Sequence, residues 1–342
     1  MSSRRRATIW LGVALAAACL VLFARGARWG EIGGILAAAN VPLILVASCC
    51  LLMTSVARAW RWHYLLREQP VSFRHRLTST LIGFAGNNVL PGRLGEPLRC
   101  WAISRLDGRL GFWQAAGSIV VERVFDLGAA VLLLLAFVWV ASSGMGGMVR
   151  DASLLARLEE HMAGAALVVL AVALAVVVAA RTGLARNARG AWAARIGASI
   201  ASLQRGLGGL TSARAFACAA LFTVVLWTAM LVFELLMLWA FGFHELGLAH
   251  ALGLLVVLSF AIALPQAPAG IGVVQLASET TLTALFGMPV DRAKAFAIGL
   301  WVCQVAVVVG AGAVALWVEG LSLAELRRVR STMESAQATL PE

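Results

Sequence analysis

The stretch Asn87-Asn88-Val89-Leu90-Pro91-Gly92-Arg93-Leu94-Gly95-Glu96-Pro97-Leu98-Arg99 decides how this chain folds. It follows an apolar run, residues 77–85, that has the character of a membrane helix cut short. Two prolines, two glycines, two asparagines and three charges then stand where hydrocarbon depth is expected. Lipid cannot solvate a broken backbone, so such a segment is tolerated only inside protein or along a wet cavity. A second break of this kind occurs at residues 264–272, and we predict that the two breaks meet and form a binding site.

The composition is that of a polytopic membrane protein. Hydrophobic residues make up 61% of the 342 residues and charged residues only 13%, about half the charged share of a soluble domain. The formal net charge of +11 comes almost wholly from arginine, since Lys294 is the only lysine. The arginines lie in short loops between apolar runs, which argues against a nucleic-acid partner. The six cysteines lack metal-ligand spacing and are interpreted as small hydrophobic residues, so neither a metal nor a cofactor is expected.

The apolar runs predict an all-α polytopic membrane protein with about six full spans and two re-entrant helical hairpins. The full spans are expected at residues 1–23, 42–60, 112–140, 164–180, 216–241 and 296–317, with the hairpins near residues 77–105 and 252–286. Six arginines and no acidic residue lie in residues 181–214, which predicts a cytoplasmic amphipathic connector. The expected order is a first membrane half (1–180), the connector (181–214), a second membrane half (215–320) and a cytoplasmic tail (321–342).

The placement of arginine predicts the orientation in the membrane. With the N-terminus inside, the second span ends at a basic, aromatic cluster, residues 58–67, interpreted as an anchor at the cytoplasmic interface. If the first broken segment crossed completely, the connector would lie outside, against the positive-inside rule. A segment that enters and returns keeps every basic loop inside. We therefore expect a multi-pass protein of the cell inner (plasma) membrane with both termini in the cytoplasm.

The same logic makes the second break a hairpin that enters from the opposite side, so that the two halves form an inverted repeat. Pro91-x-x-x-Gly95 and Pro268-x-x-x-Gly272 share a pattern at an offset of 177 residues. At that offset the run 42–60 falls on apolar residues 219–237, and the run 112–140 falls on residues 289–317. Paired discontinuous helices in inverted halves indicate the central site of a transporter.

Three motifs occur in order along the chain. Residues 88–99 read N-x-x-P-x-R-x-G-E-x-x-R, residues 122–126 read E-R-x-x-D, and residues 265–272 read P-x-x-P-x-G-x-G. Together they resemble the flippase-like integral membrane family, which includes the N-terminal transmembrane domain of lysylphosphatidylglycerol synthase. The resemblance covers nearly the whole chain, to about residue 317, and the Arg61-Trp62 ending of the second span fits it. It implies movement of lipids with charged or phosphate-linked head groups between leaflets.

Two departures from that family limit the expectation. The family often has a glutamate a few residues past the final glycine, where Gln275 stands in this chain. About 25 residues follow the last span, so the synthase's soluble aminoacyl-transferase domain is not expected here, nor is aminoacylation of lipid by this chain itself.

The residue chemistry agrees with an anionic head group. Pro97 suits the first position of a helix, whose free N–H groups and positive dipole would favour an anion. Arg93 and Arg99 add forked donors that match phosphate oxygens, although Arg93 could instead pair with Glu96 or Glu122. Gly270 and Gly272 would let backbone amides approach a ligand closely. The expected substrate-binding residues are Asn88, Pro91, Arg93, Glu96, Arg99, Glu122, Arg123, Asp126, Pro268, Gly270, Gly272 and Gln275.

Glu122 and Asp126 are four residues apart and share one face of a helix. Two carboxylates in a poor dielectric cannot both stay ionised without a partner. Either arginines neutralise them in a structural cluster, or one carries a proton and forms a proton-coupled gate. Glu234, alone inside an apolar run, is a weaker candidate of the same kind.

Two classes of function stay open. The favoured one is a lipid flippase or transporter, not an enzyme. It is not expected to draw energy from nucleotide hydrolysis, because no Gly-rich phosphate loop with lysine occurs. Its expected partner is an anionic or zwitterionic lipid head group, and a separate lipid-modifying synthase is a second candidate. The alternative is a membrane-embedded enzyme that acts on a phospholipid or polyprenyl phosphate, with Glu122 or Asp126 as the base.

Overall fold

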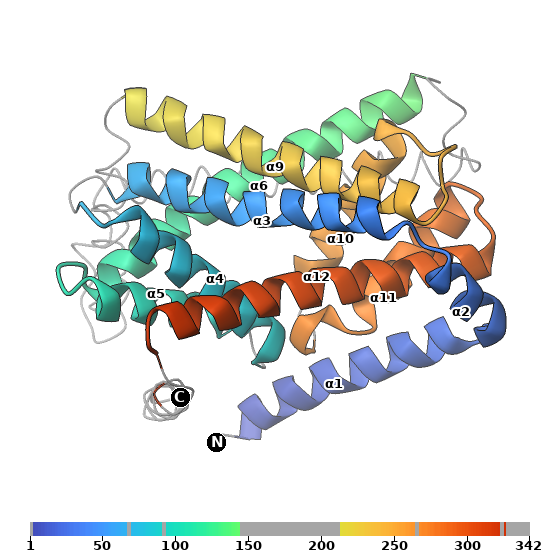
Figure 1. Cartoon of the computed structure of the whole chain (residues 1–342), viewed down its shortest axis with the longest axis horizontal. Coiled ribbons are helices and arrows are strands. Elements are labelled where there is room, and N and C mark those ends of the chain that lie inside the picture. The colour runs from blue at the N-terminus through green and yellow to red at the C-terminus, as the bar shows by residue number, and fades with distance from the viewer. Residues whose placement is uncertain are drawn as a thin grey trace.

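The computed structural model describes residues 3–66, 70–90, 94–143, 213–263, 267–321 and 325, and these form helices with no strand among them (Figure 1). The elements are α1 (Ser3–Ala24), α2 (Trp29–Ala37), α3 (Val41–Leu65), α4 (Phe73–Val89), α5 (Gly95–Leu106), α6 (Phe112–Ser142), α9 (Ala213–Ala240), α10 (Leu248–Ala263), the 3-10 turn η2 (Pro268–Gly270), α11 (Val273–Thr280), the π-helical turn η3 (Thr281–Leu285) and α12 (Val290–Val318). The predicted span 164–180 and nearly all of the connector and the tail lie outside the described residues.

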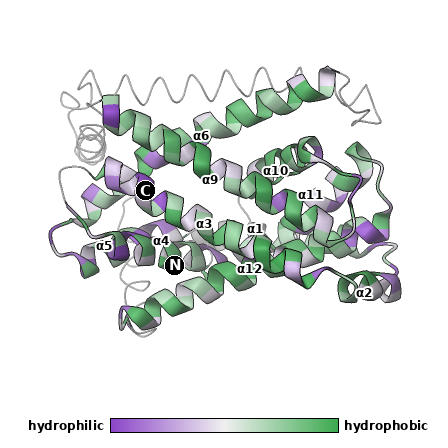
Figure 2. Ribbon diagram, turned by 45° about the horizontal axis from the view of Figure 1, so that its top comes forward, coloured by the Kyte–Doolittle hydropathy of each residue, from purple (hydrophilic) through white to green (hydrophobic). Residues whose placement is uncertain are grey.

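Within the described part of the chain, four helices are long and apolar enough to cross a membrane: α3, α6, α9 and α12. Their boundaries agree with the predicted spans 42–60, 112–140, 216–241 and 296–317 to within a few residues, except that α12 begins earlier. Ala14–Ala24 and Leu248–Ile262 are shorter apolar helices. Exposed side chains on the long helices include Leu132, Val224 and Val314, which suits contact with lipid. Hydrophobic residues dominate the long helices in Figure 2, and hydrophilic residues gather toward their ends. The chain is therefore a multi-pass membrane protein.

Helices α3 and α9 run side by side in opposite directions (Figure 1). At one end the backbone N–H of Asn40 donates to the carbonyl of Ala240 at 2.8 Å. Toward the other end Arg61 Nη1 donates to Thr223 Oγ1 at 3.0 Å. This antiparallel pair is the centre around which the two hairpins pack.

The first break joins α4 and α5 into a hairpin whose two ends meet. His75, near the start of α4, lies 3.9 Å from Asp107, directly after α5. The 17 residues of α4 extend about 25 Å, less than the roughly 30 Å of a hydrocarbon core. A Cβ at Gly95 would collide with the carbonyl oxygen of Gly83, so glycine permits the close approach of the two helices.

The second break joins α10 to α11 in the same manner. The rings of His250, near the start of α10, and Phe286, directly after η3, lie 4.9 Å apart. The hairpin ends therefore also meet. At the turn Gly272 has φ +84°, and a Cβ there would approach the carbonyl oxygen of Ala16 to 2.5 Å. The returning helix thus starts directly against α1.

Helix contacts in the first half have counterparts in the second. Helix α4 packs against α5 and α12, and α10 packs against α11 and α6. Helix α3 contacts α4 and α6, while α9 contacts α10 and α12. Exchanging α3, α4, α5 and α6 with α9, α10, α11 and α12 in that order leaves this contact pattern unchanged.

Candidate functional site

A cavity of about 340 Å³ lies where the two breaks come together. The first break contributes Asn87, Asn88, Leu90 and Glu96 to its wall, and the second contributes residues 267–270. Helices α3, α6, α9 and α12 supply further lining residues: Leu51, Leu52, Thr54, Ser55, Arg58, Arg123, Met230, Gln304, Val307, Val308 and Ala311. The two breaks thus border one cavity, as the sequence predicts.

The charged part of the wall consists of Arg58, Glu96 and Arg123. The side chains of Arg123 and Glu96 are 42% and 45% exposed, and Arg123 Nε lies 3.6 Å from Glu96 Oε1. Arg58 is more enclosed and lies over the ring of Phe84, 5.1 Å from its centroid. Two guanidiniums therefore border the cavity, where they could hold a phosphate or carboxylate group.

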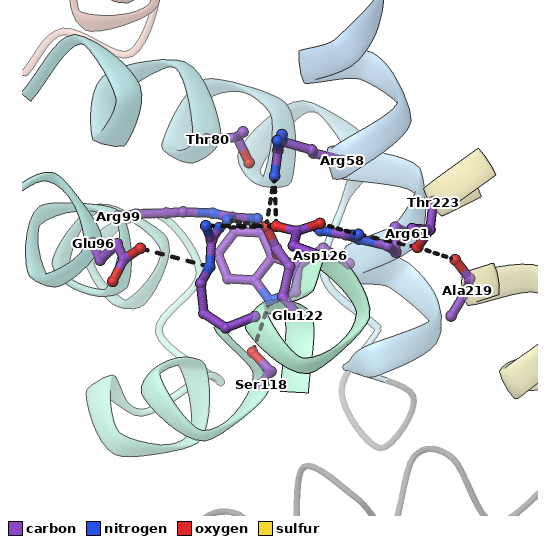
Figure 3. Close-up of polar contacts among 12 residues, drawn as sticks. Arg58, Arg61, Thr80, Glu96, Arg99, Ser118, Glu122, Asp126, Ala219 and Thr223 are labelled. Atoms are coloured by element: carbon purple, nitrogen blue, oxygen red, sulfur yellow. Dashed lines mark hydrogen bonds and ion pairs between the residues drawn. The ribbon is translucent and has the colours of Figure 1, made fainter. Parts of the chain in front are cut away.

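Behind this wall Glu122 lies fully buried among four arginines (Figure 3). Its Oε1 is 3.0 Å from Arg99 Nη1, 3.2 Å from Arg61 Nη2 and 3.2 Å from Arg123 Nη2. Arg58 Nη1 lies slightly farther away, at 3.6 Å. We call this group, together with Asp126, the arginine–carboxylate cluster. The four guanidiniums surround one carboxylate oxygen, an arrangement that fits the structural-cluster alternative, and whether Glu122 also acts as a proton-coupled gate stays a prediction.

Asp126 lies one turn along α6 and contacts three of these arginines, Arg58, Arg61 and Arg123. Its Oδ1 accepts a hydrogen bond from Arg61 Nη1 at 2.6 Å, and its Oδ2 accepts one from Arg58 Nη1 at 3.0 Å. Arg123 Nη1 is 3.5 Å from Oδ2. The cluster thus joins α3, α5 and α6, and the hydrogen bond from Arg61 to Thr223 extends it to α9.

The cluster carries more positive than negative charge. Four arginines face two carboxylates, and Glu96 at the cavity wall offsets one of the two excess charges. Five guanidinium nitrogens of the cluster and one carboxylate oxygen are buried without a hydrogen-bond partner: Arg61 Nε and Nη2, Arg99 Nε and Nη2, Arg123 Nε, and Glu122 Oε2. Excess buried charge is costly unless a further anion compensates it. The cluster therefore places net positive charge beside the cavity.

Arg99 lies within the cluster and does not line the cavity. Its guanidinium lies over the Trp62 ring, 3.9 Å from the centroid, and Trp62 Nε1 donates to Ser118 Oγ at 2.8 Å. The predicted direct contact of Arg99 with a ligand is thus not supported by its position. Its charge acts on the cavity through Glu122 and the other arginines.

The sequence missed two arginines of this site. Residues 58–67 were expected to anchor the chain at the membrane interface, but Arg61 and Trp62 are completely buried and Arg58 borders the cavity. For these residues the anchor interpretation is wrong. The spacing of polar residues could have indicated that these arginines face inward. Thr54, Arg58 and Arg61 recur at helical spacing and so share one face of the helix.

The start of α5 also differs from the prediction. The helix begins at Gly95, so Pro97 is its third residue rather than its first. The N–H of Gly95 is not free, because it donates to Asn87 Oδ1 at 2.8 Å. Asn87 therefore closes the hairpin. Both Asn87 and the predicted Asn88 line the cavity, and the side-chain amide of Asn88 donates to the Phe84 carbonyl at 2.9 Å.

At the second break the predicted residues divide into two groups. Pro268 and Gly270 line the cavity. Gly272 instead approaches α1, and its N–H donates to Gln275 Oε1 at 2.7 Å. The expectation that Gly272 lets the backbone approach a ligand is therefore wrong, and Gln275 caps the start of α11. Pro91 and Arg93 lie outside the described residues, so their predicted roles stay predictions.

The fold and the site define a class: a polytopic α-helical membrane protein with a cationic cavity between two broken helices. The chain matches the family described as lysylphosphatidylglycerol synthase TM region over residues 9–329, and it belongs to that family. It is also 29% identical over 156 residues to Glycosyltransferase AglD of Haloferax volcanii. That match covers 44% of this chain and 24% of the archaeal protein, so it spans about a quarter of that relative's length.

Proposed function

We propose that the chain is a lipid flippase or transporter that moves a lipid with a charged or phosphate-linked head group between membrane leaflets. One observation carries the proposal: both broken segments border a cavity whose wall holds Arg58 and Arg123, beside a cluster with excess positive charge. Family membership supports it, because that family is named after a lipid-modifying enzyme's membrane region. A separate lipid-modifying synthase is then a fitting partner.

The proposed topology has about six full spans and two re-entrant hairpins in an inverted repeat. The contact of His75 with Asp107 and that of His250 with Phe286 support hairpins that leave the membrane where they enter it. The equivalent packing contacts of helices α3–α6 and helices α9–α12 support the repeat. Arg58 and Arg61 near the end of α3 and Arg214 at the start of α9 lie toward the same end of this antiparallel pair, which supports a cytoplasmic location for that end by the positive-inside rule. On this proposal both termini lie in the cytoplasm, and the membrane is the plasma membrane.

The cavity wall suits a phosphate for a geometric reason. Planar guanidiniums offer paired donors that match phosphate oxygens, and a charge-assisted hydrogen bond contributes about 1.5–3 kcal/mol. Glu96 at the same wall gives a zwitterionic head group a partner for its ammonium. The lipid tails would stay in the bilayer while the head group passes through the cavity.

The second candidate is a membrane-embedded enzyme acting on a phospholipid or polyprenyl phosphate. The similarity to a protein named as a glycosyltransferase favours it. Against it, Glu122 and Asp126, the expected bases, are both bound by arginines. A base held by several guanidiniums is a poor proton acceptor, so we favour transport.

Liposomes that contain the purified protein and a trace of fluorescent lipid provide the test. Dithionite bleaches fluorescence in the outer leaflet alone, so protein-dependent movement appears as additional bleaching. We expect protein-dependent movement of a phosphate-linked lipid and recovery of that lipid chemically unchanged. A chemically altered lipid in mass spectra would favour the enzyme, and the absence of protein-dependent movement would overturn the transport proposal.

A further inference from the structure

Glu234 is a buried carboxyl for which the proposed function gives no role. It lies within the apolar helix α9 and is 2% exposed. Its Oε2 has no hydrogen-bond partner, and no ion pair of the described residues includes it. Ionisable residues inside a membrane are costly to maintain, which makes such a residue a candidate functional group.

Glu234 lies one helical turn beyond the cavity. Met230 lines the cavity from α9, four residues before Glu234. On α12, Cys303 lies near Glu234, and its neighbour Gln304 lines the cavity. Ser48 on α3 lies 3.5 Å from Cys303 (Oγ to Sγ), and Leu51 and Leu52, the next turn of α3, line the cavity. Three helices thus place Glu234 at the floor of the cavity.

The charged groups on the helices packed against α9 are engaged elsewhere. Arg61 donates to Thr223, eleven residues or about 16 Å along α9 from Glu234. The remaining groups on α3, α6, α10 and α12 have other partners. Arg58 and Arg123 contact Glu122 and Asp126, Cys50 lies beside Cys49, and His250 contacts Phe286. On α12, Asp291 pairs with Arg28, Arg292 with Glu245 and Lys294 with Glu279. His63 and Tyr64 contact each other near the end of α3. Among the residues that the structure describes, Cys303 is therefore the titratable group near Glu234.

An isolated carboxyl in apolar surroundings avoids ionisation by holding a proton. We propose that Glu234 is a proton-binding site at the floor of the cavity, protonated in this conformation and ionised when the cavity extends one turn toward it. One turn of helix is about 5.4 Å, so a small rearrangement of the hairpins would bring water to the carboxyl. The link from this proton to lipid movement rests on the proposed function.

The sign of the coupling follows from charge. An ionised Glu234 at the cavity floor repels an anionic head group, whereas a protonated Glu234 does not. Proton and head group therefore favour each other's binding, and the reciprocity of linkage requires the effect in both directions. Lipid movement should be faster at about pH 6 than at about pH 8. Glu234→Gln, which is neutral throughout, should remove this dependence.

Infrared spectroscopy tests proton binding without any transport. In lipid nanodiscs at about pH 6, wild type should show a protonated-carboxyl C=O band that is missing in Glu234→Gln and retained in Glu245→Gln, an exposed control. If Glu234→Gln does not fold, Glu234→Met replaces it. The absence of a band that depends on Glu234 would overturn the inference.

The transport arm uses the dithionite assay on the same three proteins. For wild type and Glu245→Gln, the rate of lipid movement should fall several-fold between about pH 6 and pH 8. For Glu234→Gln, the rate should be the same at both pH values. Equal pH profiles for wild type and Glu234→Gln would overturn the coupling. No movement in any vesicle would overturn the proposed function instead, and the infrared result would still decide whether Glu234 holds a proton.

Discussion

Arg99 Nη1 lies 3.0 Å from Oε1 of Glu122, and this ion pair ties the returning helix of the first hairpin to α6. Glu122 has no exposed surface, and Arg58, Arg61 and Arg123 surround the same oxygen. A buried pair repays the cost of desolvation poorly, but removal of one partner leaves the other charges uncompensated. The cluster is therefore expected to act as one unit that holds the hairpin beside the cavity.

Removal of the Glu122 charge should destabilise the protein. Glu122→Gln leaves the largely buried Arg58, Arg61 and Arg99 with Asp126 as the remaining carboxylate of the cluster. Loss of one partner of a buried ion pair costs about 3–5 kcal/mol. Thermal unfolding in detergent should show a lower midpoint for Glu122→Gln than for Glu245→Gln, whose site is exposed. An unchanged midpoint with translocation abolished would instead favour the interpretation of Glu122 as a proton-coupled gate.

Arg58 should be required for head-group binding. Loss of one charge-assisted contact should weaken binding by about 1.5–3 kcal/mol, roughly 10- to 150-fold. Arg58→Lys should restore little, because an ammonium lacks the bidentate fork. Arg74→Ala is the matched control, since that arginine is 60% exposed and pairs with Glu319. Lipid-dependent quenching of tryptophan fluorescence measures the affinity, and equal affinities for Arg58→Ala and Arg74→Ala would contradict a role in binding.

The hairpin topology predicts which positions label from the same side. In a background without the six native cysteines, single cysteines at Arg74 and Arg109 flank the first hairpin, and one at Glu245 lies between α9 and α10. An impermeant maleimide added to intact cells should label the Glu245 position, and the other two should label after permeabilisation. Labelling of Arg74 and Arg109 from opposite sides would show that the segment crosses the membrane.

The close approach of α4 and α5 should depend on Gly95. A methyl group there meets the Gly83 carbonyl, and overpacking costs about 1–3 kcal/mol or more. Gly95→Ala should lower the thermal midpoint, while Gly108→Ala should not, because no atom lies within 4 Å of a Cβ at Gly108. Equal midpoints for the two variants would contradict the tight hairpin.

The positions of the helices and the cavity could be predicted from the sequence because membranes restrict the choices. Long apolar runs predict spans, and prolines within an apolar context predict a break. Both signals are local, and the structure places α3, α6, α9 and α12 close to the predicted ranges. The two breaks border one cavity for the related reason that polar backbone needs a shared polar environment.

The assignment of individual site residues could not be predicted in the same way, because it depends on which face of a helix packs inward. Arg58, Trp60 and Arg61 look like one interfacial group in sequence, yet Trp60 is 41% exposed and Arg61 is fully buried. Likewise, Gly270 and Gly272 are two residues apart, but Gly270 lines the cavity while Gly272 contacts α1. Helix rotation and the position of α1 decide these outcomes, and neither follows from spacing alone.

Blocking the cavity chemically tests the central claim most directly. Val307 lines the cavity on α12, and Val314, seven residues later on the same helix, is 59% exposed. Each is replaced by cysteine in the cysteine-free background, and translocation of a fluorescent phosphate-linked lipid is measured before and after reaction with a bulky maleimide. If the head group passes through the cavity, the reagent should stop translocation by Val307→Cys and leave Val314→Cys unaffected. Undiminished translocation by fully modified Val307→Cys would contradict the claim that this cavity carries the lipid head group.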